Sequence, residues 1–407
     1  MKTVGILTFA KVANFGANLQ GLSTYSYFKN KGYRPVFIDW EPEDFAIRQS
    51  NDVKTKQGQA HFSFFDSLCN FTCKCRNDED IIKAVDDYSI DMLVVGSDAV
   101  LQHHPFWTRI KIPTRRIFYY DRMDSTRLFP NPFWGTFYSA LSKRIPMALM
   151  SGSSQNSPYR SFGKDEKKQM CLYLNNFSYI SVRDMWTKRM VEYITDNHLH
   201  PNITPDPVFA FNQNVGEMIP SKKEILKKYN LPEQYCLISF LDQIVSVEWL
   251  KKLDTILNKK SISCVALPMP RGILFNHCFN YSIDSPLSPI DWYALIKYSS
   301  GYVGQNMHPI VVSLHNAVPF FSFDTYGVSN FGGLFYKEKS SKIYDVLSNF
   351  NLLQNRCVGN NRFVKQPSPE FVAEQLLLFD KQVVMSKSGE YYSAYCQMMQ
   401  NIESLLL

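Results

Sequence analysis

The stretch 301-GYVGQNMHPIVVSLHNAVPFFSF-323 has the pattern of a strand, a turn and a helix, followed by a second strand. Tyr302 and Val303 are typical of the end of a buried strand. Pro309 suits the first position of a helix, which predicts that His308 is the N-cap. His308 is therefore expected at the carboxyl end of a strand, beside free backbone N–H groups. Open α/β sheets bind ligands at such places, and the ligand favoured here is an anion.

The composition is that of a globular protein with a basic surface. The chain has 407 residues, 45% of them hydrophobic and 20% charged, and this length predicts two domains. It contains no apolar run long enough for a transmembrane helix, and its nine scattered cysteines favour a reducing cytoplasm over a disulfide framework. The formal charge of +7 is spread over lysine doublets, which favours an anionic substrate or an acidic membrane surface over nucleic acid. We expect a cytoplasmic protein, with peripheral contact at the inner face of the membrane.

Strands and helices alternate twice along the chain, which predicts an α/β protein with two facing Rossmann-like domains. A polar, lysine-rich segment at 212–232 divides residues 1–215 from residues 216–407. The first half is interrupted by an aromatic, arginine-rich insertion at about 103–145. The strands are expected at 4–9, 36–40, 92–95, 147–150, 179–182, 236–240, 264–267, 302–303 and 320–323. The helices are expected at 17–30, 81–88, 186–193, 247–257, 290–297, from 308 onward, 341–350 and 370–384, whereas 41–77 shows little pattern.

Four loops that follow predicted strands carry glycine or charged residues: 14-NFGANLQ-20, Gly96-Ser97-Asp98, Arg183-Asp184 and the His308 turn. Because parallel strands end at the same edge of a sheet, all four are expected on the ligand-binding side. Each also has a structural interpretation. Asp98 either serves a ligand or caps a turn. Arg183 either binds an anion or pairs with Asp184 or a distant acid.

Neither a metal nor a nicotinamide cofactor is expected. His315 lies two helical turns beyond His308, about 10 Å along the helix axis, so the two cannot ligate one ion. The cluster Cys69, Cys73 and Cys75 could suggest a metal site but lacks a second pair at zinc-finger distance, which favours thiols in an irregular insertion. No His-x-Glu or HExxH pattern occurs, and the loop at 14–20 lacks the GxGxxG pattern of dinucleotide binding.

Taken in order, these motifs resemble those of the polysaccharide pyruvyl transferase family. The segments that carry the resemblance are 5-GILTFAKVANFGANLQ-20, 91-DMLVVGSDAV-100, 180-ISVRD-184, 206-DPVF-209, 306-NMHP-309 and 341-SKIYDVLSNFNLLQNR-356. The family often has Phe-His-Gly or Arg-Leu-His where this chain has Asn306-Met307-His308-Pro309, and Gln where this chain has Ala99. The resemblance implies two Rossmann-like domains in a glycosyltransferase-B-like arrangement.

The resemblance also implies a reaction. A pyruvyl group would pass from phosphoenolpyruvate to two hydroxyls of a sugar in a capsule polysaccharide or exopolysaccharide, or in its precursor. A cyclic ketal would form and phosphate would leave. Arg183 is the candidate for gripping the donor's carboxylate or phosphate, since guanidinium binds such groups in a bidentate way. His308 is the candidate phosphate ligand or general acid, and Asp98 is the candidate base.

The remaining candidates are substrate-binding residues. Asn14 and Gly16 would contact donor or acceptor through their loop, and Gly96 and Ser97 would shape the turn of Asp98. Asn306 and Met307 complete the candidate set beside His308. Phosphoenolpyruvate is the expected donor substrate, with no cofactor and no metal, and the acceptor glycan is either free or lipid-linked.

Two other functions remain open on sequence alone. One is a nucleotide-sugar-dependent glycosyltransferase of the same two-domain architecture, and the other is a non-catalytic glycan-binding relative. The rings of Phe106, Trp107, Trp134 and Phe137 in the insertion would either stack on a sugar, touch a lipid, or cover the cleft.

Overall fold

The first half of the chain folds around a six-stranded parallel sheet. The computed structural model describes residues 1–111, 119–241, 243–330, 335–359 and 364–406. The strand order is β2-β1-β3-β6-β7-β8. Parallel bridges from Phe37 to Phe71 and from Trp40 to Cys75 extend the sheet beyond β2, which gives a Rossmann-like order. The strand bounds are β1 (Thr3–Leu7), β2 (Arg34–Phe37), β3 (Met92–Asp98), β6 (Met147–Gly152), β7 (Tyr179–Val182) and β8 (Asn202–Ile203).

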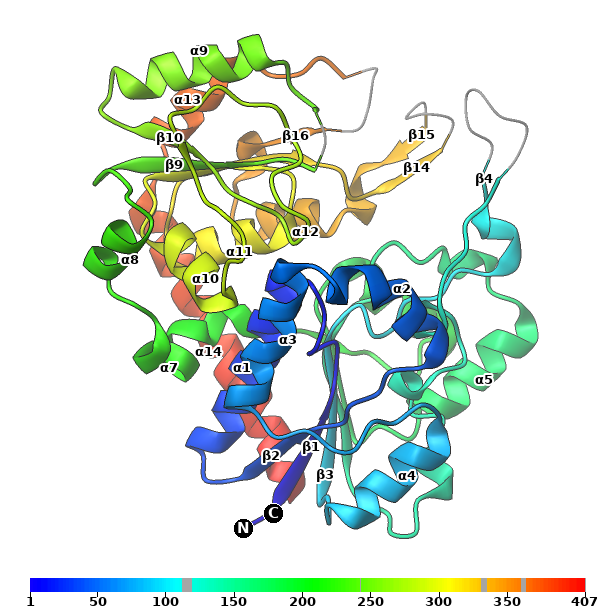
Figure 1. The fold of residues 1–407 in the computed structure, drawn as a ribbon. Helices are drawn as coiled ribbons and strands as arrows, with labels where there is room; N and C mark the ends of the chain where they lie inside the picture. Colours follow the sequence, from blue (N-terminus) through cyan, green and yellow to red (C-terminus); the bar gives the residue numbers. More distant parts are fainter. Residues whose placement is uncertain (112–118, 242, 331–334, 360–363, 407) are drawn as a thin grey trace.

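The second half repeats this plan with the strand order β11-β10-β9-β12-β13-β16, again all parallel. Its central strands β9, β12 and β13 are buried throughout, because helices cover both faces of a parallel sheet. Together the two sheets form a glycosyltransferase-B-like fold (Figure 1). The strand bounds are β9 (Tyr235–Ser239), β10 (Ser263–Ala266), β11 (Tyr281–Ser282), β12 (Gly301–Gly304), β13 (Phe320–Asp324) and β16 (Arg356–Val358).

Helices cover the two sheets and fill the junction between them. One apolar cluster runs without a break from α1 and β1 to α10, α11 and α14. Phe15 of α1 stacks on Trp292 of α10, with ring centroids 5.1 Å apart, so the two halves share a packed interface. The helix bounds are α1 (Phe15–Asn30), α4 (Asp78–Asp87), α5 (Lys164–Leu174), α6 (Met185–Ile194), α7 (Phe211–Val215), α8 (Lys222–Lys228), α9 (Val247–Asn258), α10 (Pro289–Lys297), α11 (Met307–His315) and α12 (Lys342–Asn349).

Two segments differ from their sequence-based prediction. The stretch 41–77, expected to lack pattern, contains α2 (Glu43–Val53) and α3 (Lys56–Leu68), each with only a few buried residues. Their apolar residues are few and set among many polar ones, so the sequence was not interpreted as helical there. The closing helix expected at 370–384 is two helices, α13 (Pro369–Leu377) and α14 (Lys381–Glu403).

Helix α14 connects the two halves of the molecule. It begins beside α11 of the second half and ends against the first sheet, where it runs down the junction in Figure 1. Tyr395 packs edge-on against Tyr27 of α1, and Met398 accepts hydrogen bonds from Ser151 and Ser181 in the first half. The last long helix therefore packs on α11 of the second half and on β7 of the first sheet.

The aromatic insertion at 103–145 is divided between core and surface. Trp134 and Phe137 are buried in the core of the first half, so the prediction that they offer faces to a sugar is wrong. Phe106 and Trp107 are exposed, at 53% and 78%. They precede the two-stranded ribbon of β4 (Ile110–Lys111) and β5 (Tyr119–Tyr120), and residues 112–118 lie outside the described residues.

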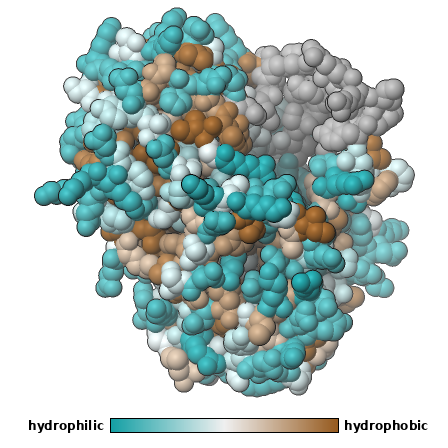
Figure 2. Space-filling view, viewed as in Figure 1, coloured by the Kyte–Doolittle hydropathy of each residue, from teal (hydrophilic) through white to brown (hydrophobic). Residues whose placement is uncertain are grey.

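Across the described residues, no helix has the length and hydrophobicity needed to cross a membrane. On the face shown in Figure 2, hydrophilic residues cover most of the surface, and apolar residues lie between them in small groups.

Candidate active site

Three side chains from the two halves converge on the carboxylate of Asp206, which follows β8. Arg183 donates from Nη1 to Asp206 Oδ2 at 2.6 Å, and Gln20 donates from Nε2 to the same oxygen. His308 of the second half places its Nε2 4.0 Å from that oxygen. The other carboxylate oxygen accepts the backbone N–H of Val208 at 3.0 Å. The two halves therefore meet at one buried aspartate.

The Arg183–Asp206 pair is held in its charged form. Burial alone would raise the pKa of Asp206, but the charges of Arg183 and His308, with hydrogen bonds, keep it below its ordinary value. The pKa of Arg183 is raised in turn, because the nearby carboxylates outweigh its burial. This pairing is the distant acid that the sequence left open for Arg183. Asp184 instead caps α6, where it accepts hydrogen bonds from Thr187.

Several polar atoms around this pair have no hydrogen-bond partner within the described part of the chain. They are Arg183 Nε and Nη2, His308 Nε2 and Gln20 Oε1. Leaving such buried groups unpaired costs about 1–3 kcal/mol each, and native proteins keep few of them. These atoms around the Arg183–Asp206 pair are therefore able to bond to a polar ligand.

The loop at 14–20 contacts His308 directly. Asn14 caps α1, and its side chain accepts the backbone N–H groups of Gly16 and Ala17. A Cβ atom at Gly16 would lie 1.9 Å from Cγ of the His308 ring, so only glycine fits there. Two of the predicted loops, one from each half, are thus brought into contact.

His308 lies within the first turn of α11 and not at its cap. The helix begins at Met307, so Asn306 occupies the N-cap position, and the prediction that His308 is the cap is wrong. Pro309 is then the third helical residue, which still needs no N–H for the helix. Burial lowers the pKa of His308 to about 4, more than the attraction of Asp206 and Asp98 raises it. Its imidazole is therefore neutral in the free protein at pH 7.

Two titratable groups of α12 face the same centre. Burial, helped by the charge of Arg183, lowers the pKa of Lys342 to about 8. Burial and the charge of Asp184 raise the pKa of Asp345 to about 6. Lys342 Nζ also lies 4.4 Å from the ring centre of Tyr326. The site thus holds a second cation that titrates near neutral pH.

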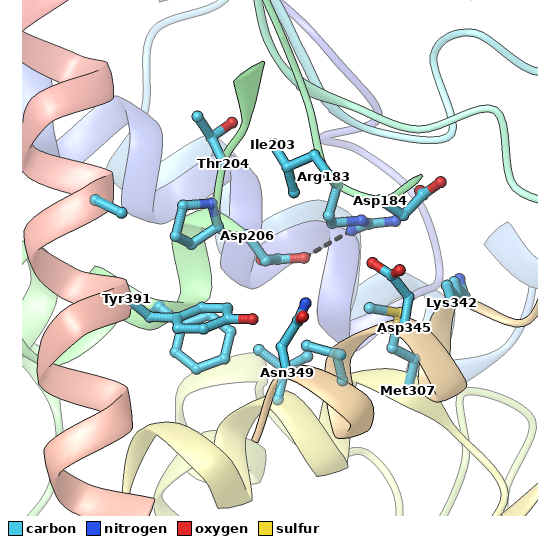
Figure 3. A pocket seen from close by; sticks show the side chains of 15 residues that line it. Arg183, Asp184, Ile203, Thr204, Asp206, Met307, Lys342, Asp345, Asn349 and Tyr391 are labelled. Atoms are coloured by element: carbon cyan, nitrogen blue, oxygen red, sulfur yellow. Dashed lines mark hydrogen bonds and ion pairs between the residues drawn. The ribbon is translucent and has the colours of Figure 1, made fainter. Parts of the chain in front are cut away.

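A pocket of about 280 Å³ lies beside these groups. Figure 3 shows side chains from α11, α12 and α14 facing Arg183 and Asp206 across it. Its lining includes Arg183, Asp206, Met307, Lys342, Asp345 and Tyr391. The Arg183 end of this pocket is strongly polar, with Arg183 and Lys342 among the carboxylates of Asp184, Asp206 and Asp345, whereas the Tyr391 end is more apolar.

Asp98 faces a neighbouring pocket of about 360 Å³, which it lines together with Asn14. Its backbone has a positive φ of 91°, and Oδ1 accepts the N–H of Ala99 at 2.8 Å. Gly96 has φ +110°, and a Cβ there would lie 2.3 Å from the carbonyl oxygen of Met150. Gly96 therefore makes possible the turn that presents Asp98. Asp98 contributes to the electrostatic field at Arg183, His308 and Lys342, so both pockets belong to one site.

The last two predicted residues lie on either side of the start of α11. Met307 lines the pocket of Arg183, whereas Asn306 donates from Nδ2 to the sulfur of Met269 at 3.1 Å. Among the residues that the structure describes, no group of three or more His, Cys, Asp or Glu side chains is placed to hold a metal ion.

Sequence reasoning missed three residues of this centre: Gln20, Asp206 and Lys342. Asp206 lies between two prolines and opens the segment 206-DPVF-209, which carries the family resemblance but assigns the residue no role. Gln20 and Lys342 lie on helices, and no local pattern separates them from ordinary surface polar residues. Two prolines around a carboxylate, directly after the last strand of a sheet, are the one signal that marked this position.

Solved structures of other proteins have the same fold. The UDP-N-acetylglucosamine 2-epimerase from Rickettsia bellii has a TM-score of 0.50 and 10% identity, over 100% of this chain and 97% of that one. Arabidopsis thaliana UGT89C1, complexed with quercetin, has a TM-score of 0.51 and 11% identity, over 100% and 99% of the chains. At such identities the likeness shows the fold alone. No curated protein sequence matches this chain significantly.

A match to a family model shows which family the chain belongs to. The model described as polysaccharide pyruvyl transferase matches residues 14–326, which make up most of the chain. The match begins at the loop that contacts His308 and includes Asp98, Arg183 and Asp206. The chain therefore belongs to the polysaccharide pyruvyl transferase family and is a transferase enzyme.

Proposed function

We propose that this protein transfers the pyruvyl group of phosphoenolpyruvate to two hydroxyls of a sugar, forming a cyclic ketal and releasing phosphate. The observation that carries the proposal is the set of unpartnered donors on Arg183 and His308, next to Lys342. Phosphoenolpyruvate has a carboxylate and a phosphate on one small carbon skeleton. Such a ligand would accept hydrogen bonds from both free nitrogens of Arg183 at once.

The reaction adds two protons to the donor fragments, and the two sugar hydroxyls release the same number. One hydroxyl proton is matched by a proton added to the methylene carbon of the donor, which becomes the methyl group. The other is matched by the proton on the departing phosphate. Two C–O bonds form at the central carbon of the donor, its C=C bond becomes a C–C single bond, and its C–O bond to phosphate breaks.

We assign the base to Asp98 and the acid to His308. Asp98 lines the pocket beside Asn14, where an acceptor hydroxyl can approach. The imidazole of His308 is neutral in the free enzyme because it is buried. A bound donor with three negative charges favours the protonated imidazole, so donor binding charges His308 when it is needed as an acid.

No metal is required for this mechanism, and we propose that none is used. Arg183 and Lys342 bring two positive charges to the donor, and protonated His308 adds a third. Turnover should therefore survive EDTA treatment and dialysis. Loss of turnover that Mg²⁺ or another divalent ion restores would contradict this part of the proposal.

The sequence also predicts an acceptor that is lipid-linked or free, and contact with the inner face of a membrane. The exposed rings of Phe106 and Trp107 support such contact, since aromatic rings settle at membrane interfaces. Sedimentation with vesicles of acidic lipid should carry the wild-type protein down and leave Trp107→Ser in solution. Equal sedimentation of both would count against this surface.

The decisive experiment measures phosphate release from phosphoenolpyruvate, with and without a panel of galactosides, glucosides and mannosides. Release that depends on one sugar, with a product heavier by the mass of a ketal-linked pyruvate, is the expected result. Donor binding can be checked separately, because phosphoenolpyruvate should raise the melting temperature. Stabilisation by a nucleoside diphosphate sugar, with no phosphate release, would instead favour glycosyl transfer.

A further inference from the structure

A second pocket, of about 320 Å³, lies beyond the carboxyl ends of β1 and β2. In Figure 1 this edge of the first sheet lies below α2 and α3. The pocket has none of the residues that line the pocket of Arg183. Its wall is rich in aromatic rings, which come from Phe9, Trp40, Phe45, Phe62, Phe71 and Phe133.

The rings of this wall hold one another in place. Phe133 is buried and packs against two half-buried rings, Phe9 with centroids 4.8 Å apart and Trp40 edge-on at 4.7 Å. Phe9 also packs against Phe45 at 6.0 Å. Rings fixed from behind in this way offer firm apolar faces at low entropic cost to a ligand.

A carboxylate without hydrogen-bond donors stands beside these rings. Asp39 has a side chain only 18% exposed, and no described residue donates a hydrogen bond to its carboxylate. Its nearest cation, Lys11 Nζ, is 3.9 Å away and lies closer to Asp66, at 3.0 Å. Burial accordingly raises the pKa of Asp39. The carboxylate has room for donors that come from a ligand.

Aromatic faces beside free carboxylate oxygens match the chemistry of a sugar ring. The C–H face of a sugar packs on aromatic rings, and its hydroxyls donate to carboxylate oxygens. The pocket lining carries three acidic groups, Asp39, Glu41 and Asp66, against Lys11 and Lys74. Lys74 pairs with Glu41, and Lys11 lies nearer to Asp66, so Asp39 is the carboxylate left to accept the hydroxyl donors of a neutral sugar or an amino sugar.

The second pocket adjoins the pocket of Asp98. Phe9, Val12 and Phe45 line both of them. We propose that the aromatic pocket is a second sugar subsite, which binds the uncharged sugar unit next to the unit that receives the pyruvyl group. This inference rests on the proposed function, because it takes the pocket of Asp98 as the place of the reacting sugar. The enzyme would then recognise a disaccharide and not a single sugar.

Binding of neutral glycosides tests the subsite without knowledge of the natural acceptor. The probes are methyl glycosides of galactose, glucose and mannose, with lactose, cellobiose and mannobiose as their disaccharide counterparts. Their affinities for the whole protein can be measured by saturation-transfer NMR and calorimetry. We expect at least one disaccharide to bind about tenfold more tightly than its monosaccharide, the worth of one good hydrogen bond to a charged group.

Two variants address the pocket and one serves as the control. Asp39→Asn is nearly isosteric and should abolish the disaccharide advantage, as should Phe62→Ala, which removes an aromatic face. Glu43→Gln removes an exposed charge of α2 outside the pocket and should keep the wild-type affinities. No disaccharide advantage in the wild type, or its persistence in both pocket variants, would overturn the subsite.

Binding of phosphoenolpyruvate tests the proposed donor separately from the proposed sugar subsite. Phosphoenolpyruvate should raise the melting temperature of wild type, Asp39→Asn and Phe62→Ala to the same extent, since the aromatic pocket lies outside the donor site. If phosphoenolpyruvate stabilised none of the proteins, the donor assignment would fail while the glycoside result still decided the subsite.

Discussion

Each half of the molecule contains a buried arginine–aspartate pair, and the two pairs differ in how completely the arginine is used. Arg356 donates to Asp324 from Nε at 2.6 Å, to Glu338 from Nη1 at 2.7 Å and to Tyr336 from Nη2 at 3.1 Å. Arg183 donates to Asp206 from Nη1 alone, and its other two nitrogens have no partner among the described residues. The protein saturates the guanidinium of Arg356, whereas two nitrogens of Arg183 have no partner among the described residues and are free for the donor that we propose.

The Arg356–Asp324 pair also helps to position a residue of the candidate site. Asp324 accepts a hydrogen bond from the hydroxyl of Ser341, which is the N-cap of α12. The next residue is Lys342, the second cation of the donor pocket. The Arg356–Asp324 pair of the second half thus helps to position Lys342, which lies near the Arg183–Asp206 pair of the first half.

The largest loss of turnover is expected from substitution of His308 and Asp98, which lie near the Arg183–Asp206 pair. His308→Ala and Asp98→Asn should lower turnover by about 10²–10⁴-fold, the usual contribution of a general acid or base. Phosphate release with the identified acceptor is the measurement, and melting curves confirm the fold. Soluble variants that melt normally and turn over at near-wild-type rates would remove His308 and Asp98 from the mechanism.

The other histidine of α11 provides the matched control. His315 is buried, burial lowers its pKa to about 3, and its Nε2 accepts the backbone N–H of Asn212 at 3.4 Å. His315→Gln should lower the melting temperature and leave phosphate release per folded molecule unchanged.

The contact between Gly16 and His308 should give the next largest effect. Gly16→Ala places a methyl group inside the imidazole ring, so the ring must move. A displacement of about 1 Å at a reacting group costs about 10²-fold in rate. Gly216→Ala is the control, because its Cβ would meet no atom within 4 Å and its φ of −52° suits alanine. Similar rates for the two alanine variants would show that the Gly16 contact has no part in positioning His308.

Exchange of each arginine for lysine tests the comparison itself. Arg183→Lys should lower kcat/KM for phosphoenolpyruvate by about 10–100-fold, the loss of one or two hydrogen bonds to a charged group. Arg356→Lys should mainly lower the melting temperature, because its three hydrogen bonds all go to the protein. Stabilisation by phosphoenolpyruvate should be weakened only in Arg183→Lys. An equal loss of donor binding in both variants would show that the distinction between the two pairs is false.

The smallest effect is a pH dependence that follows from Lys342. Its pKa is lowered to about 8 by burial, so it loses its positive charge as the pH rises through that value. The KM for phosphoenolpyruvate should then rise by up to about tenfold between pH 7 and 9.5. Lys342→Arg should remove this rise, since guanidinium stays protonated, whereas Lys339→Arg on the exposed surface should keep it. A flat wild-type profile would exclude Lys342 from donor binding.

The sequence predicted the two-sheet fold because buried parallel strands are short apolar runs with loops at fixed ends. The strands at 92–95 and 179–182 lie inside β3 and β7, and the loops after them reach one site. The same reasoning failed for α2 and α3, whose apolar faces are narrow. It also failed for Trp134 and Phe137, because aromatic content alone does not separate a core ring from a binding ring.

The centre of the site was only partly predictable for a different physical reason. Arg183 and His308 belong to local motifs that a single sequence displays. Asp206 gains its importance only from the arrangement of other elements around it, with Gln20 lying 186 residues earlier in the chain. Residues this far apart in the chain come together only in the folded protein, so no short stretch of sequence shows that they form one site.

Gly16 and His308 belong to opposite halves and touch without room for a side chain between them. Any rotation that parts the halves must therefore draw the imidazole away from Asp206 and from Arg183. The contacts that meet at Asp206 are therefore kept only while the two halves stay packed as they are. The apolar cluster that α1 shares with α10 and α11 holds the halves in that arrangement.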